Sequence, residues 1–525
     1  MTPPTLETPH PRRGIRWWPA LLLLAASAVV IAAFRLQDTP FQQRNLRTLI
    51  TLVITGAALF LWWLTLSRAR WKLRLTVAAI VVGLMGLAAA SFRIRGVSGD
   101  LLPILEPRWA RSAPPATEPA VTPAPADPVL AAGARTDFPQ FLGPDRTATV
   151  AGITLDPDWA AHPPTVVWRQ PIGAAWSGFA VVGERAVTQE QRGDQESVTC
   201  YDLRTGRLLW AHGDAASYST TIAGAGPRCT PTIVSNRVFT LGATGLLNCL
   251  ELASGRLVWQ RSITGDAGAR MPEWGFAGSP LFLDGLVIVS AGGQPDRSLL
   301  AYRADSGELA WAAGSAPVGY SSPFVAELAG VRQILLFNSR RITAHDPVAG
   351  SVLWEYPWGV GQPHVAVPVV VGTNRVVFSS GYGVGAELLD IGRQTDGSLA
   401  ATRVWQSRRM KAKFANLVAR DGFLYGLDDG ILACVDLADG SQRWKEGRYG
   451  HGQGLLVGGH FLLMSEPGEL VLLRPTPEAP HELHRFRVFS SKTWDPIAPA
   501  GEFLLVRNDL EAACLRLALA DSALR

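Results

Sequence analysis

The hydrophobic pattern divides the chain into two parts. In the first part, three uninterrupted apolar runs cover residues 17–34, 49–66 and 75–92, each about 18 residues long and free of charged residues. This length is close to the minimum for a helix that crosses roughly 30 Å of hydrocarbon. Beyond residue 135 the apolar stretches are short and alternate with polar positions, as β-strands do. The pattern therefore predicts three transmembrane helices over residues 17–92, followed by an all-β domain over residues 135–525.

Basic residues around the apolar runs indicate the orientation of the helices. The tail before the first run carries three Lys or Arg residues, and the loop before the third run carries four. The loop before the second run carries three, offset by Asp38. Because short cytoplasmic loops are enriched in Lys and Arg, this bias predicts a cytoplasmic tail over residues 1–16. Three spans then place the all-β domain outside the cytoplasm, on the periplasmic side of the inner membrane.

The first apolar run also resembles a signal peptide, because Arg12, Arg13 and Arg16 precede a stretch rich in Leu and Ala. Two further spans follow at once, so we interpret this run as an uncleaved first helix. No ionisable residue lies inside the three runs, which indicates a membrane anchor rather than an ion or proton path. Contact with a quinone or with a partner subunit stays open as an alternative.

Residues 93–134 are predicted to form an extracytoplasmic linker. Their segment 112–133 reads SAPPATEPAVTPAPADPVLAAG and is rich in Pro and Ala. Such a composition favours extended polyproline II over a packed core, at roughly 3.1 Å per residue. We expect this stretch to act as a spacer between the membrane and the all-β domain.

A ten-residue phrase recurs through the all-β domain. YDLRTGRLLW at 201–210 returns in altered form at 250–259, 302–311, 345–354 and 435–444. Each copy carries a Gly four residues before a Trp, and each reads as two strands joined by a turn. Another strand pair precedes each copy, so every unit has four short antiparallel strands. Four such strands are the plan of one propeller blade.

Eight units account for the whole domain. Trp residues end the fourth strand of successive units at roughly 40–50-residue intervals. They are Trp168, Trp210, Trp259, Trp311, Trp354, Trp405 and Trp444. The last unit has only three strands, whereas residues 165–171 form an outer strand with no unit before it. Pairing the two closes the ring and leaves no open sheet edge. The sequence thus predicts an eight-bladed β-propeller with four antiparallel strands per blade.

The D-x-x-T/S-G-x-x-x-W hairpin, the eight units and the leading DFPQFLGPDR at 137–146 resemble the quinoprotein, or PQQ-like, β-propellers. This family includes PQQ-dependent alcohol and glucose dehydrogenases, and also the non-enzymatic outer-membrane assembly lipoprotein BamB. The resemblance covers roughly residues 135–525 and implies that the Trp side chains pack between neighbouring blades. It implies no particular chemistry, because a fold does not determine a function.

The distribution of charge argues against a nucleic-acid partner. Residues 1–111 carry 14 Lys and Arg against 4 Asp and Glu, whereas the remaining residues carry 35 basic and 40 acidic groups. The basic character of the chain therefore belongs to the membrane region. Nothing in the predicted propeller indicates a basic face that binds nucleic acid.

The mouth of the predicted propeller holds the candidate binding residues. Residues just before the innermost strands line such a mouth. When the units are aligned on the position of Pro231, the residues three positions earlier include Thr493. The aromatic and basic side chains at or near those positions are the candidates. They are Trp176, Arg228, Trp274, Tyr320, His364, Lys413, His451 and Trp494. Ring stacking and charge-assisted hydrogen bonds suit a flat, anionic ligand such as PQQ. The plain alternative is that polar residues at these loop–strand junctions face water.

The stretch TQEQRGDQES at 188–197 is a second candidate for a place in the funnel. On this hypothesis Gln189, Glu190 and Arg192 point toward the axis. The more usual interpretation of such a charged run is a solvated turn.

Cysteine usage gives no sign of a metal or redox site. Cys200, Cys249, Cys434 and Cys514 occupy matching third-strand positions of separate blades, too far apart for disulfides, whose Cα atoms lie within about 7 Å. No metal-ligand spacing occurs among the Cys and His residues, so no metal site is predicted. The PQQ dehydrogenases of the family typically carry a pair of adjacent cysteines, and this chain has none. Their calcium ligands and catalytic Asp cannot be placed here by motif.

These observations leave three functions open. The first is a non-enzymatic binding or scaffold protein of the cell envelope that resembles BamB and binds envelope proteins. The second is a membrane-bound dehydrogenase that uses PQQ with calcium, oxidises an alcohol or a sugar, and passes electrons to quinone. The third is a sensor of a small ligand in the funnel. The absence of adjacent cysteines favours the first.

Overall fold

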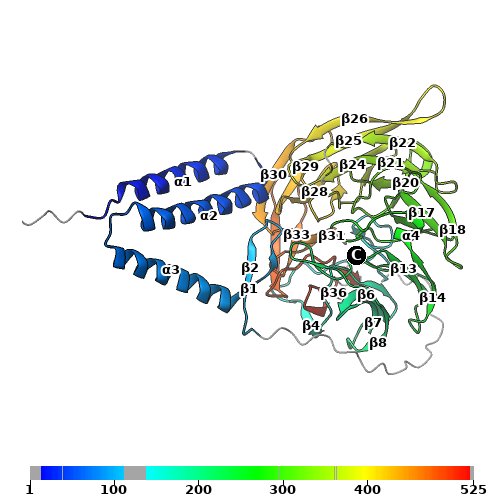
Figure 1. Cartoon of the computed structure of the whole chain (residues 1–525). Coiled ribbons are helices and arrows are strands. Elements are labelled where there is room, and N and C mark those ends of the chain that lie inside the picture. The colour runs from blue at the N-terminus through cyan, green and yellow to red at the C-terminus, as the bar shows by residue number, and fades with distance from the viewer. Residues whose placement is uncertain are drawn as a thin grey trace, which may run out of the picture. The chain divides into compact units, whose positions relative to one another are not determined.

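The computed structural model describes residues 14–37, 39–110, 137–293, 295–359, 361 and 363–520. The chain divides into two compact units, Met1–Arg111 and Ser112–Arg525 (Figure 1). The predicted spacer at 112–133 and most of the predicted cytoplasmic tail lie outside the described residues.

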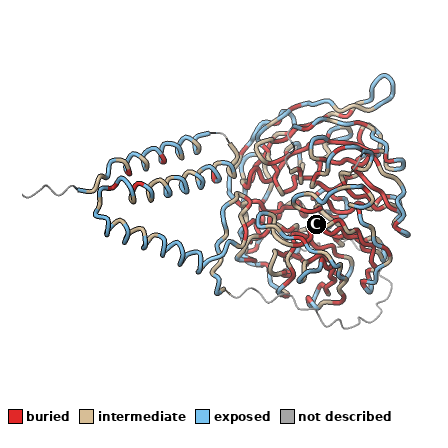
Figure 2. The backbone as a smooth tube through the Cα atoms, in the orientation of Figure 1, coloured by how far each residue is buried: buried red, intermediate tan, exposed pale blue. Residues whose placement is uncertain are grey.

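The first unit contains three helices, α1 (Trp18–Leu36), α2 (Phe41–Thr65) and α3 (Trp71–Ser91). All three are long and apolar enough to cross a membrane, which confirms that prediction. α2 starts at Phe41 rather than Leu49, because residues 41–48 are polar but compatible with a helix. Most of their side chains are exposed (Figure 2), as expected for helices that face lipid.

An antiparallel hairpin follows α3 directly, with β1 at Phe92–Val97 and β2 at Pro103–Pro107. It lies in the segment that the sequence analysis assigned to the linker, and it was not predicted. Its two strands are short, and their alternation is too brief to stand out after the long apolar run of α3.

The second unit is a ring of eight antiparallel sheets, which confirms the predicted propeller. The first four blades follow one another along the chain. Blade 1 contains β5 (Ala180–Val182), β6 (Arg185–Arg192), β7 (Gln195–Asp202) and β8 (Leu208–Asp214). Blade 2 contains β11 (Thr232–Val234), β12 (Arg237–Leu241), β13 (Leu246–Glu251) and β14 (Leu257–Ser262). Blade 3 contains β15 (Leu281–Leu283), β16 (Leu286–Ser290), β17 (Leu299–Arg303) and β18 (Leu309–Ala313). Blade 4 contains β19 (Phe324–Leu328), β20 (Val331–Phe337), β21 (Arg341–His345) and β22 (Val352–Pro357).

The remaining blades include the longest hairpin and the closure of the ring. Blade 5 contains β23 (Val369–Val371), β24 (Arg375–Ser380), β25 (Gly385–Arg393) and β26 (Leu399–Ser407). Blade 6 contains β27 (Val418–Arg420), β28 (Phe423–Asp428), β29 (Ile431–Asp436) and β30 (Gln442–Arg448). Blade 7 contains β31 (Gln453–Val457), β32 (His460–Met464), β33 (Glu469–Arg474) and β34 (His481–Arg487). Blade 8 contains β35 (Ala498–Ala500), β36 (Phe503–Arg507), β37 (Glu511–Arg516) and, from far upstream, β4 (Thr165–Pro171).

The pairing of β4 with β37 closes the ring. Trp168 of β4 lies opposite Cys514 of β37 in this ladder. The outer strand of blade 8 therefore comes from the start of the propeller sequence, as predicted from residues 165–171. The buried residues concentrate in this unit (Figure 2), with the first strands of neighbouring blades in contact around the axis.

Two short elements lie in loops that lead into first strands. β9 (Ser219–Thr220) and β10 (Gly224–Ala225) form a small hairpin before β11. α4 (Ile263–Ala267) is a short helix before β15, and the hydroxyl of Ser262 caps it by accepting a hydrogen bond from the N–H of Gly265.

Residues 137–155, here called the axial segment, contact the first strands of several blades. Phe138 pairs with Val181 of β5. β3 (Thr149–Val150) runs parallel to β31 and gives the sheet of blade 7 a fifth strand. Between them, Arg146 donates hydrogen bonds of 3.0 Å to two carbonyl groups at the start of β15. This arrangement was not predicted from the sequence.

The two flanks of the axial segment lie at one end of the first strands, whereas the Arg146 side chain reaches the start of β15. A side-chain oxygen of Asp137 accepts a hydrogen bond from the N–H of Gly183, and the carbonyl of Val150 accepts one from Gly458. Both glycines belong to turns that leave a first strand. The predicted mouth residues instead lie where the chain enters these strands, so they are at the opposite end of the ring.

Tryptophans join each blade to the next by covering a glycine turn. The Trp210 ring lies over Gly255 of blade 2, and its indole N–H donates a 2.9 Å hydrogen bond to the carbonyl of Leu252. Gly255 has a φ of +71°, and a Cβ atom there would lie 2.4 Å from the Trp210 ring. Only glycine adopts this positive φ without strain and also lacks the Cβ atom that would clash with the ring. The same two contacts recur for Trp168, Trp259 and Trp405 with Gly206, Gly307 and Gly440.

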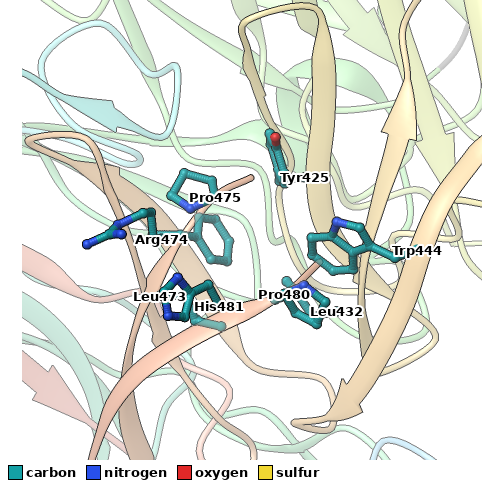
Figure 3. Close-up of a pocket in the computed structure, with 9 residues that line it drawn as sticks. Tyr425, Leu432, Trp444, Leu473, Arg474, Pro475, Pro480 and His481 are labelled. Carbon is teal, nitrogen blue, oxygen red and sulfur yellow. The ribbon is translucent and has the colours of Figure 1, made fainter. Parts of the chain in front are cut away.

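The turn of blade 7 lacks this glycine, and a small pocket lies there (Figure 3). Trp444 and Tyr425 of blade 6 form one side, and Pro475 and Pro480 of blade 7 form another. Trp444 still donates to the turn, with a 2.9 Å hydrogen bond to the carbonyl of Thr476. The enclosed space takes about one water molecule. We attribute the pocket to looser packing under a Pro-containing turn rather than to a ligand site.

The glycine turns give a direct test of this packing. We expect Gly255→Ala to lower the free energy of unfolding by about 2–5 kcal/mol, since it adds a steric clash with Trp210 to the cost of a positive φ. Gly285→Ala is the matched control, because Gly285 has a φ of +81° but no described atom beyond its chain neighbours within 4 Å of the added Cβ. It is expected to cost only about 1–2 kcal/mol. Denaturant unfolding of the full chain in detergent measures both, and equal costs would contradict the proposed role of the ring.

Candidate functional site

The mouth of the ring holds two groups of aromatic and basic side chains. The tryptophan cluster consists of Trp176, Lys413, Phe414, His451, Lys492 and Trp494. The tyrosine cluster consists of Tyr218, Arg228, Trp274 and Tyr320. Together they include seven of the eight residues selected from the sequence. Their role in binding stays a prediction.

Three rings of the tryptophan cluster contact one another. The Trp494 ring centroid lies 4.9 Å from that of Trp176 and 5.1 Å from that of Phe414. Lys492 places its Nζ atom 3.9 Å from the Trp494 ring centroid. These residues precede the first strands of blades 1, 6 and 8, so the contacts tie three blades together. Ring–ring and cation–π contacts of this kind stabilise the arrangement beyond simple burial.

Lys413 and His451 lie beside Phe414 and are buried. Lys413 Nζ is 5.1 Å from the Phe414 ring centroid and 5.0 Å from that of Tyr382. The ring centroid of His451 is 5.5 Å from that of Phe414, and its backbone N–H donates to Glu466 at 2.9 Å. Because both side chains are buried, they support the Phe414 ring more than they present charge to solvent.

Arg228 is the centre of the tyrosine cluster. Its guanidinium lies 4.5 Å from the ring centroid of Tyr218 and donates hydrogen bonds to the carbonyl groups of Ala223, Gly224 and Gly226 in its own loop. Burial lowers the pKa of Arg228 to about 10, so the group stays charged at neutral pH.

The tyrosine cluster also includes a pair of half-buried rings. The ring centroids of Trp274 and Tyr320 lie 5.5 Å apart. The Tyr218 hydroxyl donates a 2.6 Å hydrogen bond to the carbonyl of Glu273, which fixes the loop that carries Trp274. Burial raises the pKa of Tyr320, so its hydroxyl remains neutral at physiological pH.

One carbonyl group connects the two clusters. The oxygen of Ala223 accepts from Trp176 Nε1 at 2.7 Å and from Arg228 Nη2 at 2.8 Å. Ala223 lies in the turn of the β9–β10 hairpin, so this small hairpin spans the two groups. The clusters therefore form one surface rather than two separate sites.

His364 is the candidate whose side chain does not join this surface. Its ring stacks on Phe337 with centroids 4.4 Å apart and is fully buried. Nε2 donates to the carbonyl of Ser339 at 2.9 Å, so Nδ1 accepts from the Ser380 hydroxyl at 2.9 Å. Burial lowers its pKa to about 4, which keeps the ring neutral. These contacts give His364 a structural role in blades 4 and 5.

Sequence reasoning missed Tyr218, Tyr382, Phe414 and Lys492. Phe414 follows Lys413, and Lys492 lies next to Thr493, which the blade alignment had selected. A window wider by one residue would have included both. Tyr218 and Tyr382 come from loops whose path no strand pattern fixes, so their approach to the mouth could not be predicted.

The stretch 188–197 forms two paired strands joined by an exposed turn at residues 193–195, so the solvated turn holds only for its tip. Glu190 is fully buried, and its Oε2 accepts from the N–H of Gly173 at 2.7 Å and from Arg192 Nε at 3.0 Å. Its Oε1 accepts a 2.5 Å hydrogen bond from the hydroxyl of Tyr201. Both interpretations of Glu190 from the sequence were wrong, because β6 and β7 carry it into a buried network within blade 1.

This network continues across the seam between blades 8 and 1. Arg507 is buried and donates to Thr188 Oγ1 at 3.0 Å and to the carbonyl of Gly173 at 2.7 Å. Its Nε lies 3.4 Å from a carboxylate oxygen of Asp495. Burial raises the pKa of Asp495, whose oxygens receive no hydrogen bond from the described residues. The seam thus combines apolar packing with a buried polar network.

The mouth residues do not fit PQQ with calcium. The Arg228 guanidinium is engaged by its own loop, and the rings of Trp176 and Trp494 lie too close for a flat ligand between them, which needs planes about 7 Å apart. Calcium takes 6–8 oxygen ligands. Among the described residues no group of three or more His, Cys, Asp or Glu is placed to hold a metal ion.

The five cysteines are also placed as packing residues. All are free and buried. Burial raises the pKa of Cys200 to about 12, which makes its thiol a poor nucleophile at neutral pH. No disulfide is therefore formed across the blades, as the sequence analysis expected.

A comparison with protein families finds a match within the propeller. The family model described as outer membrane protein assembly factor BamB matches residues 194–446, from β7 to β30, slightly less than half of the chain. This part of the propeller is similar to that family. No curated protein gives a significant match to the chain.

Solved structures resemble the propeller at low sequence identity. The quinohemoprotein alcohol dehydrogenase of Comamonas testosteroni has a TM-score of 0.55 and 13% identity, covering 73% of this chain and 81% of its own. A europium-containing methanol dehydrogenase has a TM-score of 0.56 and 12% identity, covering 72% and 91%. BamB from Moraxella catarrhalis has a TM-score of 0.49 and 15% identity, covering 67% and 100%. At these identities the similarity concerns the fold alone.

The buried His364 predicts a pH effect on stability. Its folded pKa lies below the unfolded value, so the stability it provides is present above pH 6.5 and is lost as the pH falls toward 4. Between pH 7 and 5 this loss amounts to about 2 kcal/mol. We expect His364→Gln to be less stable than the parent at pH 7 and to lose about 2 kcal/mol less on acidification.

Unfolding of the full chain in urea at both pH values measures this difference. The exposed His481, changed to Gln, is the control and should leave the pH dependence unchanged. An unchanged pH dependence in the His364→Gln protein would show that His364 is not the titrating group.

Proposed function

We propose that the protein is a membrane-anchored binding or scaffold protein of the cell envelope, and that the mouth of its propeller binds a segment of a partner protein. The three helices hold it in the inner membrane, with the propeller on the periplasmic side. The bias of Lys and Arg in the short loops supports this orientation. The match to the model of an assembly factor supports the scaffold role.

The observation that carries the proposal is the surface formed by the two clusters. Trp274, Tyr320 and Trp494 are half-buried at the mouth, and Arg228 and Lys492 add positive charge beside them. Aromatic residues and Arg dominate the energetic centres of protein interfaces.

The charge of this surface indicates the kind of segment that it binds. The mouth carries the half-buried Lys492 next to half-buried rings, whereas Glu273 is an exposed carboxylate at its rim. A partner segment with acidic and apolar side chains would place an acidic group near Lys492 and cover the rings.

The alternative is a PQQ-dependent dehydrogenase that passes electrons to quinone. It would need the rings of Trp176 and Trp494 to separate and the Arg228 guanidinium to leave its loop carbonyls. These rearrangements would cost free energy on binding, whereas a preformed cofactor site would need no such rearrangement. We therefore place the binding function first.

Photocrosslinking from the mouth tests the proposal. A benzoylphenylalanine in place of Trp274, in the full chain in its native membrane, is expected to capture a discrete envelope protein. The same group in place of Val348, which is 82% exposed in the outer turn of blade 4, is the control and should not capture it. Adding Lys492→Glu should reduce the yield of the crosslink about tenfold, the size of a moderate interface contact.

Two results would contradict this function. One is a crosslinking result: either Lys492→Glu leaves the yield of the crosslink from position 274 unchanged, or positions 274 and 348 give crosslinks of equal yield. The other is a rise in melting temperature with PQQ and calcium together with dye-linked oxidation of an alcohol or a sugar, which would establish the dehydrogenase instead.

A further inference from the structure

The β1–β2 hairpin is fixed to the membrane helices at both of its ends. At its base, β1 begins at the residue after α3, and the backbone N–H of Arg108 donates to the carbonyl of Ser91 at 2.8 Å. At its tip, the side-chain amide of Asn45 in α2 donates to the carbonyl of Asp100 at 3.3 Å. Figure 1 shows the hairpin running from the end of α3 toward the start of α2.

These two attachments set the direction of the hairpin. The end of α3 and the start of α2 lie on the same side of the membrane, because the two helices are consecutive spans. Asn45 lies about 6 Å along α2 before the apolar run that begins at Leu49, at the depth of the lipid headgroups. The base and the tip are both at this level, so the hairpin runs along the membrane surface rather than away from it.

One face of the hairpin is apolar and exposed. Ile94 pairs with Leu105 and Phe92 pairs with Pro107, which places all four on one face. Ile94 is 58% exposed and Leu105 is 62% exposed. Trp109, next to the Phe92 ring at 6.0 Å between centroids, is 71% exposed and extends this face.

The other face carries the charges. Arg93 pairs with Glu106 in the ladder, and an ion pair of 2.8 Å joins their side chains. Ile104 lies on the same face and is half-buried. The hairpin is thus amphipathic across its two faces. A two-stranded hairpin alone is only marginally stable in water, so an apolar face left in water would give it little support.

We propose that this hairpin is an interfacial membrane element, with its apolar face resting on the lipid bilayer on the side where the chain continues to the propeller. The occupant of the face is lipid, because the helices bring the face to the headgroup level and Trp109 and Phe92 are residues typical of that zone. The hairpin then holds the start of the linker at the membrane surface. This inference does not depend on the function proposed for the mouth.

Site-specific labels on the two faces test the proposal. The full chain is reconstituted in phosphatidylcholine vesicles with an environment-sensitive NBD fluorophore on Leu105→Cys or on Glu106→Cys. These adjacent positions on β2 lie on opposite faces and are the matched pair. The five native cysteines are buried and leave the introduced one as the reactive thiol.

Lipid spin-labelled near the top of the acyl chain should quench the label at 105 at least about threefold more than the label at 106, because an interfacial face sits about 5–10 Å into the headgroup boundary. Ile94→Cys should behave as Leu105→Cys does, which guards against a local effect of one substitution. Equal quenching at 105 and 106 would overturn the proposal. A label at 105 that is shielded from aqueous iodide but not quenched by lipid would also overturn it, since a protein would then cover the face.

Discussion

The stacking of an indole ring on a glycine turn is the contact on which the propeller depends. Each such pair fixes two neighbouring blades at once, through the ring over the glycine and the indole N–H on a turn carbonyl. Four interfaces depart from it. Trp311 lies over Gly350, but its indole N–H has no acceptor among the described residues. Trp354 donates to Gln333 of its own blade, since the next blade has a long hairpin in place of the short turn, and Trp444 donates to a Pro-containing turn. The fourth strand of blade 7, β34, contains no Trp. A closed ring tolerates these departures, because each blade still has two neighbours.

The two ends of this ring have different chemistry. The axial segment packs at one end with main-chain pairing and a buried Arg146, so that end is made largely of the chain itself. The other end carries rings and cations that hold one another and their own loops. The propeller fold is similar to that of a quinohemoprotein alcohol dehydrogenase, whereas the rings and cations at this end are held by one another and by their own loops. On the function proposed above, a partner protein would bind this surface.

The repeat made the fold predictable, and the loops limited what was predictable of the site. The Gly and Trp spacing gave the blade plan and even the closure by residues 165–171, because a fixed turn and a fixed packing contact leave a periodic signal. The positions of Arg228 and Trp494 followed from the same register. The register does not predict the axial segment, the hairpin at 92–107 or the position of Tyr218. Each of these occurs once and depends on contacts between residues that are distant in sequence. His364 shows the limit of register alone, because its backbone reaches the mouth while its ring turns into the core.

The pairing of β4 with β37 also governs how the protein is made. The outer strand of blade 8 is synthesised about 350 residues before its partner, which at about 5–20 residues per second is a wait of about 20–70 s. Throughout that time the growing blades form an open arc, with an unpaired strand at the start and an incomplete sheet at the end, and such edges readily pair with other chains. Closure of the ring by β37 is therefore the step that removes both unpaired edges at once. The order of the strands along the chain makes this the last pairing of the propeller to form during synthesis.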